Sequence, residues 1–225
     1  SAKQLWFDSR SNTSGVSWRL VGPRGVVVND RPFYYDDNGL GLLPAGTYSL
    51  EVTGTAGEPF AFSVLDFSAA TSLALDASTT VTLDPANSAK LYTFSGTAGQ
   101  VVFFDSTALS SSDPSGYGRY SDWRLIDQSG VQVGSTWSIS GDSGRLTLPT
   151  TGSYTLVLQG HYYATGTTEA TFTVRAVADT TAAMTLGTEV SGTLAIGQVK
   201  SYTFTLASAK QLWFDSRSNT SGVSW

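Results

Sequence analysis

The residues that could carry out chemistry are few and lie far apart in the chain. His161, in the Gly- and Tyr-rich stretch "GHYYATG", is the only histidine, and there is no cysteine. A hydrolytic triad or a zinc site needs a histidine together with a nucleophile, a carboxylate or further ligands. No carboxylate pair lies in a glycosidase-like context, and no glycine-rich loop leads into a helix that could hold phosphate. We therefore expect no enzyme activity, no catalytic residue and a surface-loop position for His161.

Hard oxygen ligands occur together in one turn-like stretch, "YYDDNG". Asp36, Asp37 and Asn38 in this stretch could ligate Ca²⁺. The stretch at the matching place later in the chain, "TWSISGDSG", holds one acid. A turn is therefore the preferred interpretation and calcium the alternative, and no other cofactor is expected.

A second set of acids recurs in the motif "FDS". Asp8, Asp105 and Asp215 each follow an apolar run typical of a strand. An Asp at such a place most often accepts hydrogen bonds from backbone N–H groups of a turn. We prefer this role to cation binding.

Aromatic and arginine side chains gather in three stretches between the apolar runs. Tyr and Arg are favoured at protein interfaces, and Tyr rings can also stack on sugars. The stretches either make contacts between neighbouring units or fold back over the ends of the fold, and the sequence leaves both open. The interface candidates are Arg31, Phe33, Tyr34, Tyr35, Tyr117, Arg119, Tyr120, His161, Tyr162 and Tyr163.

Composition narrows the class of protein. Charged residues make up 14% of the chain, the net charge is −5, and Thr, Ser and Gly are abundant. The negative charge argues against nucleic acid as a partner, because phosphates would be repelled. No apolar run approaches the 18 or more residues of a membrane span. Together with the lack of cysteine, this predicts an extracellular or cell-surface protein of bacterial type.

Alternation of apolar and polar residues predicts an all-β fold. In "TYSLEVT", Tyr48, Leu50 and Val52 share one face of a strand, and Gly-containing turn signals separate such runs. Trp6, Trp18 and Trp123 fall inside strands and are expected in the core. The other residues expected to be buried are Leu5, Phe7, Leu20, Tyr48, Leu50, Tyr92, Phe94, Val102, Phe104, Leu125, Tyr154, Leu156 and Phe204.

The sequence repeats at two levels. Ser1–Trp18 and Ser208–Trp225 are identical, which gives a period of 207 residues. Within the period, "WRLVGPRG" matches "WRLIDQSG" and "LPAGTYSLEV" matches "LPTTGSYTLVL", so two related units of roughly 100 residues alternate. We expect 1–67 to be the C-terminal part of one β-sandwich, 68–178 a complete sandwich, and 179–225 the N-terminal strands of the next.

The repeats favour an origin in a longer array of near-identical 207-residue periods. A complete protein with one duplicated terminus is the alternative. In an array, residues 183–206 and 1–67 of one chain should lie at opposite ends of the central sandwich. Hydrogen bonds between these two segments would instead indicate a closed two-domain protein.

The segments "VSGTLAIGQVKSYTF", "SWRLVGPRG" and "LPAGTYSLEV" resemble the bacterial pre-peptidase C-terminal (PPC) family. The resemblance covers essentially the whole chain in permuted order and implies jelly-roll-like β-sandwiches. PPC domains are found at the ends of secreted proteases and in tandem within large surface proteins. The chain departs from the family in "WRL", where an acidic residue often precedes the Leu.

Two classes of function follow from these patterns. The first is a structural repeat of an extracellular bacterial fibre, stalk or giant adhesin shaft, with neighbouring copies of the same repeat as partners. The alternative is a carbohydrate- or protein-binding module of a secreted protein, with cell-surface glycans as partners. Near-identical repeats favour the structural class, because a regular fibre needs the same interface each time.

Overall fold

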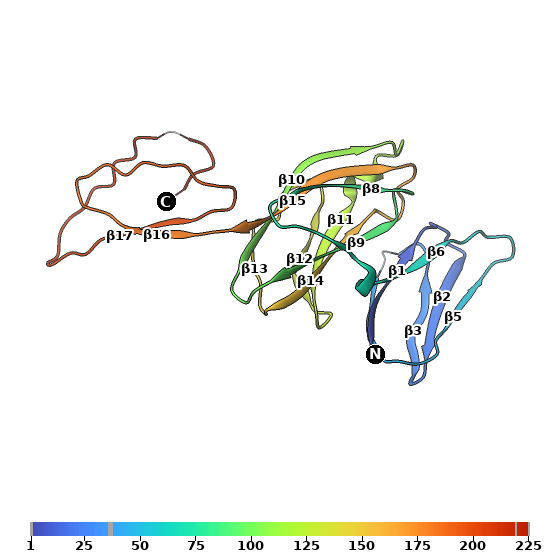
Figure 1. Cartoon of the computed structure of the whole chain (residues 1–225). Helices are drawn as coiled ribbons and strands as arrows, with labels where there is room; N and C mark the ends of the chain where they lie inside the picture. The colour runs from blue at the N-terminus through green and yellow to red at the C-terminus, as the bar shows by residue number, and fades with distance from the viewer. Residues whose placement is uncertain (1, 36–37, 219, 225) are drawn as a thin grey trace.

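The computed structural model describes residues 2–35, 38–218 and 220–224, and the fold it shows is built from β-strands (Figure 1). Helical structure within these ranges consists of two single 3₁₀ turns, η1 (Phe67–Ala69) and η2 (Tyr117–Tyr120). The prediction of an all-β fold is confirmed. None of the helical turns in the described ranges has the length or apolar character needed to cross a bilayer.

Residues 2–67 form the N-terminal sandwich, made of two three-stranded antiparallel sheets with strand orders β4-β1-β6 and β3-β2-β5. Alternation selects the buried face: Val16, Trp18 and Leu20 of β2 are buried, and the residues between them are less so. The ring of Phe7 stacks on Trp18 at 3.8 Å between centroids and joins the two sheets. The strands are β1 (Lys3–Ser9), β2 (Val16–Gly22), β3 (Gly25–Pro32), β4 (Asn38–Leu43), β5 (Ser49–Gly54) and β6 (Phe62–Asp66).

Residues 68–178 form the central sandwich, whose sheets have the strand orders β13-β10-β15-β8 and β12-β11-β14-β9-β7. Trp123 stacks on Phe104 of the facing sheet at 4.4 Å and on Trp137 at 4.6 Å, in the middle of the core. The strands are β7 (Thr71–Ser72), β8 (Ser78–Leu83), β9 (Ala89–Gly96), β10 (Val101–Ser111), β11 (Asp122–Asp127), β12 (Gln132–Ser138), β13 (Arg145–Thr147), β14 (Gly152–Gln159) and β15 (Thr168–Val177).

The two sandwiches have the same plan. The order β4-β1-β6 corresponds to β13-β10-β15, and β3-β2-β5 corresponds to β12-β11-β14, in line with the sequence repeats. In the central sandwich, β8 pairs with β15 and β9 pairs with β14. Within the described ranges of the N-terminal sandwich, β6 and β5 have no such partners and are sheet edges.

Residues 179–224 form an extended C-terminal segment. Two short strands, β16 (Thr180–Ala183) and β17 (Lys200–Thr203), pair with each other in parallel. Figure 1 shows this segment on one side of the central sandwich and the N-terminal sandwich on the other. No strand pair in the described ranges joins residues 183–206 to residues 1–67.

Most residues expected in the core are buried or partly buried. Leu5, Tyr48, Leu50 and Tyr92 are partly buried against a core cluster, and all the others are buried except one. The expectation for Phe204 is wrong, because its side chain is 45% exposed. Its counterpart Phe94 is covered by the facing sheet of the central sandwich, and no such sheet covers Phe204.

Candidate functional site

An apolar cluster joins the N-terminal sandwich to the central one. Trp6 of β1, 2% exposed, lies against Leu91, Ile126 and Val157 on the outer face of the central five-stranded sheet. Phe7, the next residue, points into the core of its own sandwich. Because successive strand residues face opposite ways, β1 is buried on both faces. The continuous apolar run Leu5–Phe7 is the sequence signal for such a strand.

Polar contacts surround this junction. The Asp8 carboxylate is fully buried; it pairs with Arg10 at 3.0 Å and accepts a 3.0 Å hydrogen bond from the backbone N–H of Ala89. The Arg124 guanidinium of β11 lies over the Trp6 ring, 5.4 Å from its centroid, a cation–π arrangement. The two sandwiches are therefore held by an apolar centre together with a buried carboxylate and a guanidinium beside it.

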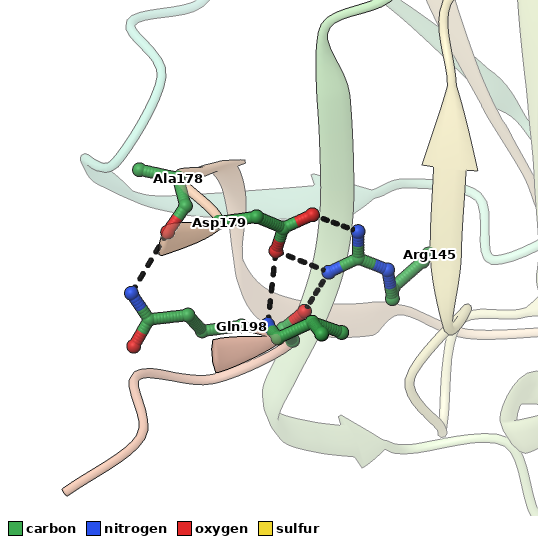
Figure 2. A network of polar contacts seen from close by, with 6 residues as sticks. Arg145, Ala178, Asp179 and Gln198 are labelled. Carbon is green, nitrogen blue, oxygen red and sulfur yellow. Dashed lines mark hydrogen bonds and ion pairs between the residues drawn. The ribbon is translucent and has the colours of Figure 1, made fainter. Parts of the chain in front are cut away.

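A second junction joins the central sandwich to the C-terminal segment (Figure 2). Arg145 of β13 binds both carboxylate oxygens of Asp179 and donates to the carbonyl of Gly197. Asp179 also accepts a 2.9 Å hydrogen bond from the backbone N–H of Val199, while the Gln198 side chain donates to the Ala178 carbonyl at 2.8 Å. A planar guanidinium facing a carboxylate in this bidentate way fixes direction as well as distance.

The charges of this second junction stabilise each other. Hydrogen bonds from Arg145, and then from the Val199 N–H, lower the pKa of the Asp179 carboxyl below its ordinary value. The hydrogen bond to Asp179 raises the pKa of Arg145. The pair is therefore ionised at neutral pH.

The two junctions place equivalent groups in contact. Ala89 and Val199 occupy the same position in their units, one residue before the matching lysines Lys90 and Lys200. In each case the N–H of this residue is bound by a carboxylate that is itself paired with an arginine. Asp8 of the N-terminal sandwich binds Ala89 N–H, and Asp179 of the linker before β16, held by Arg145, binds Val199 N–H. Phe103, the counterpart of Trp6, lies so close to Gly197 that a Cβ there would come within 2.9 Å of its ring.

The three "FDS" acids make different contacts. Asp8 binds across the junction, Asp105 pairs with Arg175 of the neighbouring strand β15, and Asp215 pairs with Arg217. Cross-junction contacts of this kind could not be read from the motif, because the partner lies in another unit.

The predicted aromatic stretches come together in part. Tyr117 stacks on His161 at 4.9 Å, and Tyr120 and Tyr163 lie at the edges of the same cluster. His161 also stacks on Tyr162, at 4.5 Å. Tyr120, 58% exposed, presents the most open ring of this group.

Two of the candidates from the N-terminal sandwich lie against each other. Tyr34 and Tyr35 are neighbours at 4.9 Å. The pKa of Tyr34 is raised, first by Tyr35, then by burial, and least by Tyr163.

The remaining candidates from these stretches lie elsewhere. The expectation that Phe33 lies at an interface is wrong. Its side chain is fully buried and packs edge-on against Phe7 at 5.8 Å between ring centroids, so Phe33 belongs to the core. Arg31 belongs to β3 and lies opposite Trp18 of β2.

A polar groove lies beside the aromatic cluster. Its volume is about 450 Å³, and Arg119 and Tyr120 line it together with Asp113 and Ser111. Burial would raise the pKa of Asp113, but hydrogen bonds from Thr165 and the backbone hold it below its ordinary value. Asp113 therefore fixes the loops that form the groove wall.

No group of three or more His, Asp or Glu side chains that could hold a metal occurs in the part of the chain that the structure describes. Of the calcium candidates, Asp36 and Asp37 lie outside the described residues, as does the side chain of Asn38. The calcium interpretation of this stretch stays a prediction.

No protein-family model matches this sequence, and no curated protein matches it. Among solved structures, the chain is similar to PliG of Aeromonas hydrophila, a periplasmic inhibitor of g-type lysozyme, with 11% identity and a TM-score of 0.36 over 47% of this chain and 96% of that one. It is also similar to the pre-peptidase C-terminal domain of a collagenase from Bacillus anthracis, with 15% identity and a TM-score of 0.31 over 47% of this chain and 94% of that one.

Proposed function

We propose that this chain is a structural repeat of an extracellular bacterial fibre, stalk or adhesin shaft. The observation that carries the proposal is one contact that recurs at both junctions. The backbone N–H at positions 89 and 199, which are equivalent in successive units, is bound each time by a carboxylate that is paired with an arginine. A shaft needs successive units to meet in a reproducible way, and a contact that recurs at both junctions supports this function.

Apolar burial supports the same function. The first junction encloses Trp6 between two sandwiches, so the units are not beads on a free linker. Short connections also limit bending: the chain passes from β6 to β7 through one 3₁₀ turn, and from β15 to β16 within a few residues. The composition, poor in charge and free of cysteine, fits a bacterial surface location.

Electron microscopy of the source cells, with antibodies against this chain, tests the proposal. We expect labelled filaments on the cell surface whose axial repeat is roughly 70–80 Å per 207-residue period, from the size of two 100-residue units in line. Antibody label spread over the surface without filaments, or confined to the cell interior, would contradict it.

The aromatic cluster and groove favour a second candidate, a glycan-binding module. The rings of Tyr117 and Tyr120 lie beside a groove lined by hydroxyl groups and Arg119, which suits the mixed apolar and polar faces of sugars. A glycan array probed with the wild-type chain and with Tyr120→Ala tests this candidate. Binding that Tyr120→Ala abolishes would support it, and equal signals from both proteins would contradict it.

A further inference from the structure

Two edge strands of the N-terminal sandwich, β5 and β6, correspond to strands that are paired on both sides in the central sandwich. Strands β5 and β6 end its two sheets in the described residues, whereas their counterparts β14 and β15 pair with β9 and β8. Phe60 and Val64, in and beside β6, are 52% and 42% exposed. Unpaired strand edges with exposed apolar side chains are templates for a further strand.

The C-terminal segment has the strands that these edges lack. The parallel pair β16–β17 repeats the pair β7–β9: Leu73 N–H donates to the Thr93 carbonyl at 2.8 Å, and Met184 N–H donates to the Thr203 carbonyl at 2.8 Å. The stretch "SGTLA" before β17 matches "TVTLD" of β8. The segment is thus already organised as the start of a sandwich.

Exposed side chains of the segment correspond to core residues of the central sandwich. Leu194 and Phe204 are 46% and 45% exposed, whereas their counterparts Leu83 and Phe94 are 1% and 5% exposed. Burial of such side chains is favourable because it removes apolar surface from water. The segment and the open edges therefore complement each other in strands and in apolar surface.

We propose that residues 180–206 of one copy complete the N-terminal sandwich of a second copy by strand addition. This inference rests on the proposed function and names its partner: another molecule of the same chain. Within the described chain the segment and the open edges lie on opposite sides of the central sandwich, so the segment reaches such an edge only on another copy (Figure 1). Donor and acceptor surfaces differ, so the association is head-to-tail and continues into a filament.

The central sandwich gives the register of the added strands. Leu156 of β14 lies opposite Tyr92 of β9, so Leu50 of β5 lies opposite Tyr202 of the donated β17. Glu51 then lies opposite Ser201, and both side chains are exposed in the single chain. Residues 208–224 of the donor repeat the sequence that forms β1. In the second copy its own Lys3–Ser9 already lies between β4 and β6, so residues 208–224 of the donor take no part in this contact.

Disulfide trapping between two single-cysteine variants tests the proposal, because the chain has no cysteine of its own. Opposite residues of antiparallel strands have Cβ atoms about 4.5–5.5 Å apart, within reach of a disulfide after a small adjustment. A mixture of Glu51→Cys and Ser201→Cys chains should give a covalent dimer on non-reducing gels, increasing with protein concentration. Each variant alone should give far less.

Thr53→Cys mixed with Thr203→Cys is the matched control. Both residues lie on the same strands and the same face as the test pair, but the register separates them by four residues, about 13 Å along the strand. Dimer in the test mixture and none in the control supports strand addition. No dimer in either mixture, or equal dimer in both, overturns it.

The result separates this inference from the proposed function. A trapped dimer from a protein whose source cells carry no labelled filaments contradicts the fibre and leaves strand addition standing. Filaments with the expected axial repeat but no trapped dimer overturn strand addition and leave the fibre standing.

Discussion

The buried carboxylate of Asp8 accepts a hydrogen bond from the backbone N–H of Ala89, 81 positions further along the chain. Asp179 accepts a hydrogen bond from Val199 N–H, the equivalent of Ala89, at the other side of the central sandwich. The two acids come from different places in their units, one from strand β1 and one from the linker before β16. What the two junctions share is the donor, a backbone N–H at the start of β9 in one case and directly before β17 in the other.

Asp8→Ala should destabilise the protein by about 1.5–3 kcal/mol, because the Ala89 N–H loses a charged partner and Arg10 loses its counter-ion. Urea denaturation measures the change. Asp215→Ala, the same residue in the second copy of the motif, should change stability by no more than about 0.5 kcal/mol, since its side chain is 64% exposed. Equal effects of the two substitutions would contradict the role of Asp8 at the junction.

Trp6→Ala should cost about 3–5 kcal/mol, because a large ring is removed from an enclosed site between two sandwiches. The matched variant is Trp213→Ala, at a position that is 92% exposed. At dilute concentration it should leave stability within about 0.5 kcal/mol of the wild type. Thermal unfolding of both variants at one concentration checks the difference, and a small loss in Trp6→Ala would place that ring outside the junction.

Tyr154→Ala should cost about 3–5 kcal/mol, as expected for a fully buried ring. Tyr154→Phe should cost about 1 kcal/mol, since the hydroxyl donates to the Thr150 carbonyl at 2.6 Å and accepts from the Thr150 N–H. Denaturant unfolding measures both, with Tyr120→Phe as an exposed control that should have no effect. A loss below 1 kcal/mol in Tyr154→Ala would put this ring on the surface.

Asp66 should make stability depend on pH in acid. The hydrogen bond from Lys3, followed by those from Ser68, lowers the pKa of Asp66 from 3.8 to about 2. A carboxyl with a lowered folded-state pKa stabilises the fold above its unfolded pKa, so this contribution is complete above pH 4 and is lost as the pH falls towards 2. The loss should be small, because the pair is near the surface.

Carboxyl chemical shifts of Asp66, followed by NMR titration, measure this pKa directly. Lys3→Met should move the pKa of Asp66 back towards 3.8. Lys210→Met, at the same position of the second motif copy, should leave the pKa of Asp66 where it is. An unchanged Asp66 titration in Lys3→Met would show that Lys3 is not the cause.

The strands and the core could be predicted because alternation reports which residues face inward. In β2, Val16, Trp18 and Leu20 are buried, as the pattern indicates. Trp6 shows where the pattern stops: it is buried, but against another unit, and alternation cannot tell a strand's own core from a neighbour's. The prediction that Phe204 is buried was wrong for the converse reason. An apolar side chain of a strand is buried only where a second sheet faces it, and Phe204 is exposed.

The grouping of some aromatic residues could be predicted, while their role at an interface stays a prediction. Tyr117, Tyr120, His161, Tyr162 and Tyr163 come together because their loops share one end of the central sandwich. Phe33 follows a strand and precedes two tyrosines, and composition alone grouped it with them. Its place in the core depends on packing against Phe7, a contact between residues far apart in sequence.

Because one stretch occurs twice in the chain, the local opening of its backbone can be compared between two identical sequences. Residues 3–9 form strand β1, while the identical residues 210–216 form no strand. Intrinsic propensity and intrinsic amide-exchange rates are the same in both copies, so they cancel in a comparison. The ratio of exchange rates at paired positions such as Phe7 and Phe214 therefore reports the protection that tertiary structure alone confers on β1.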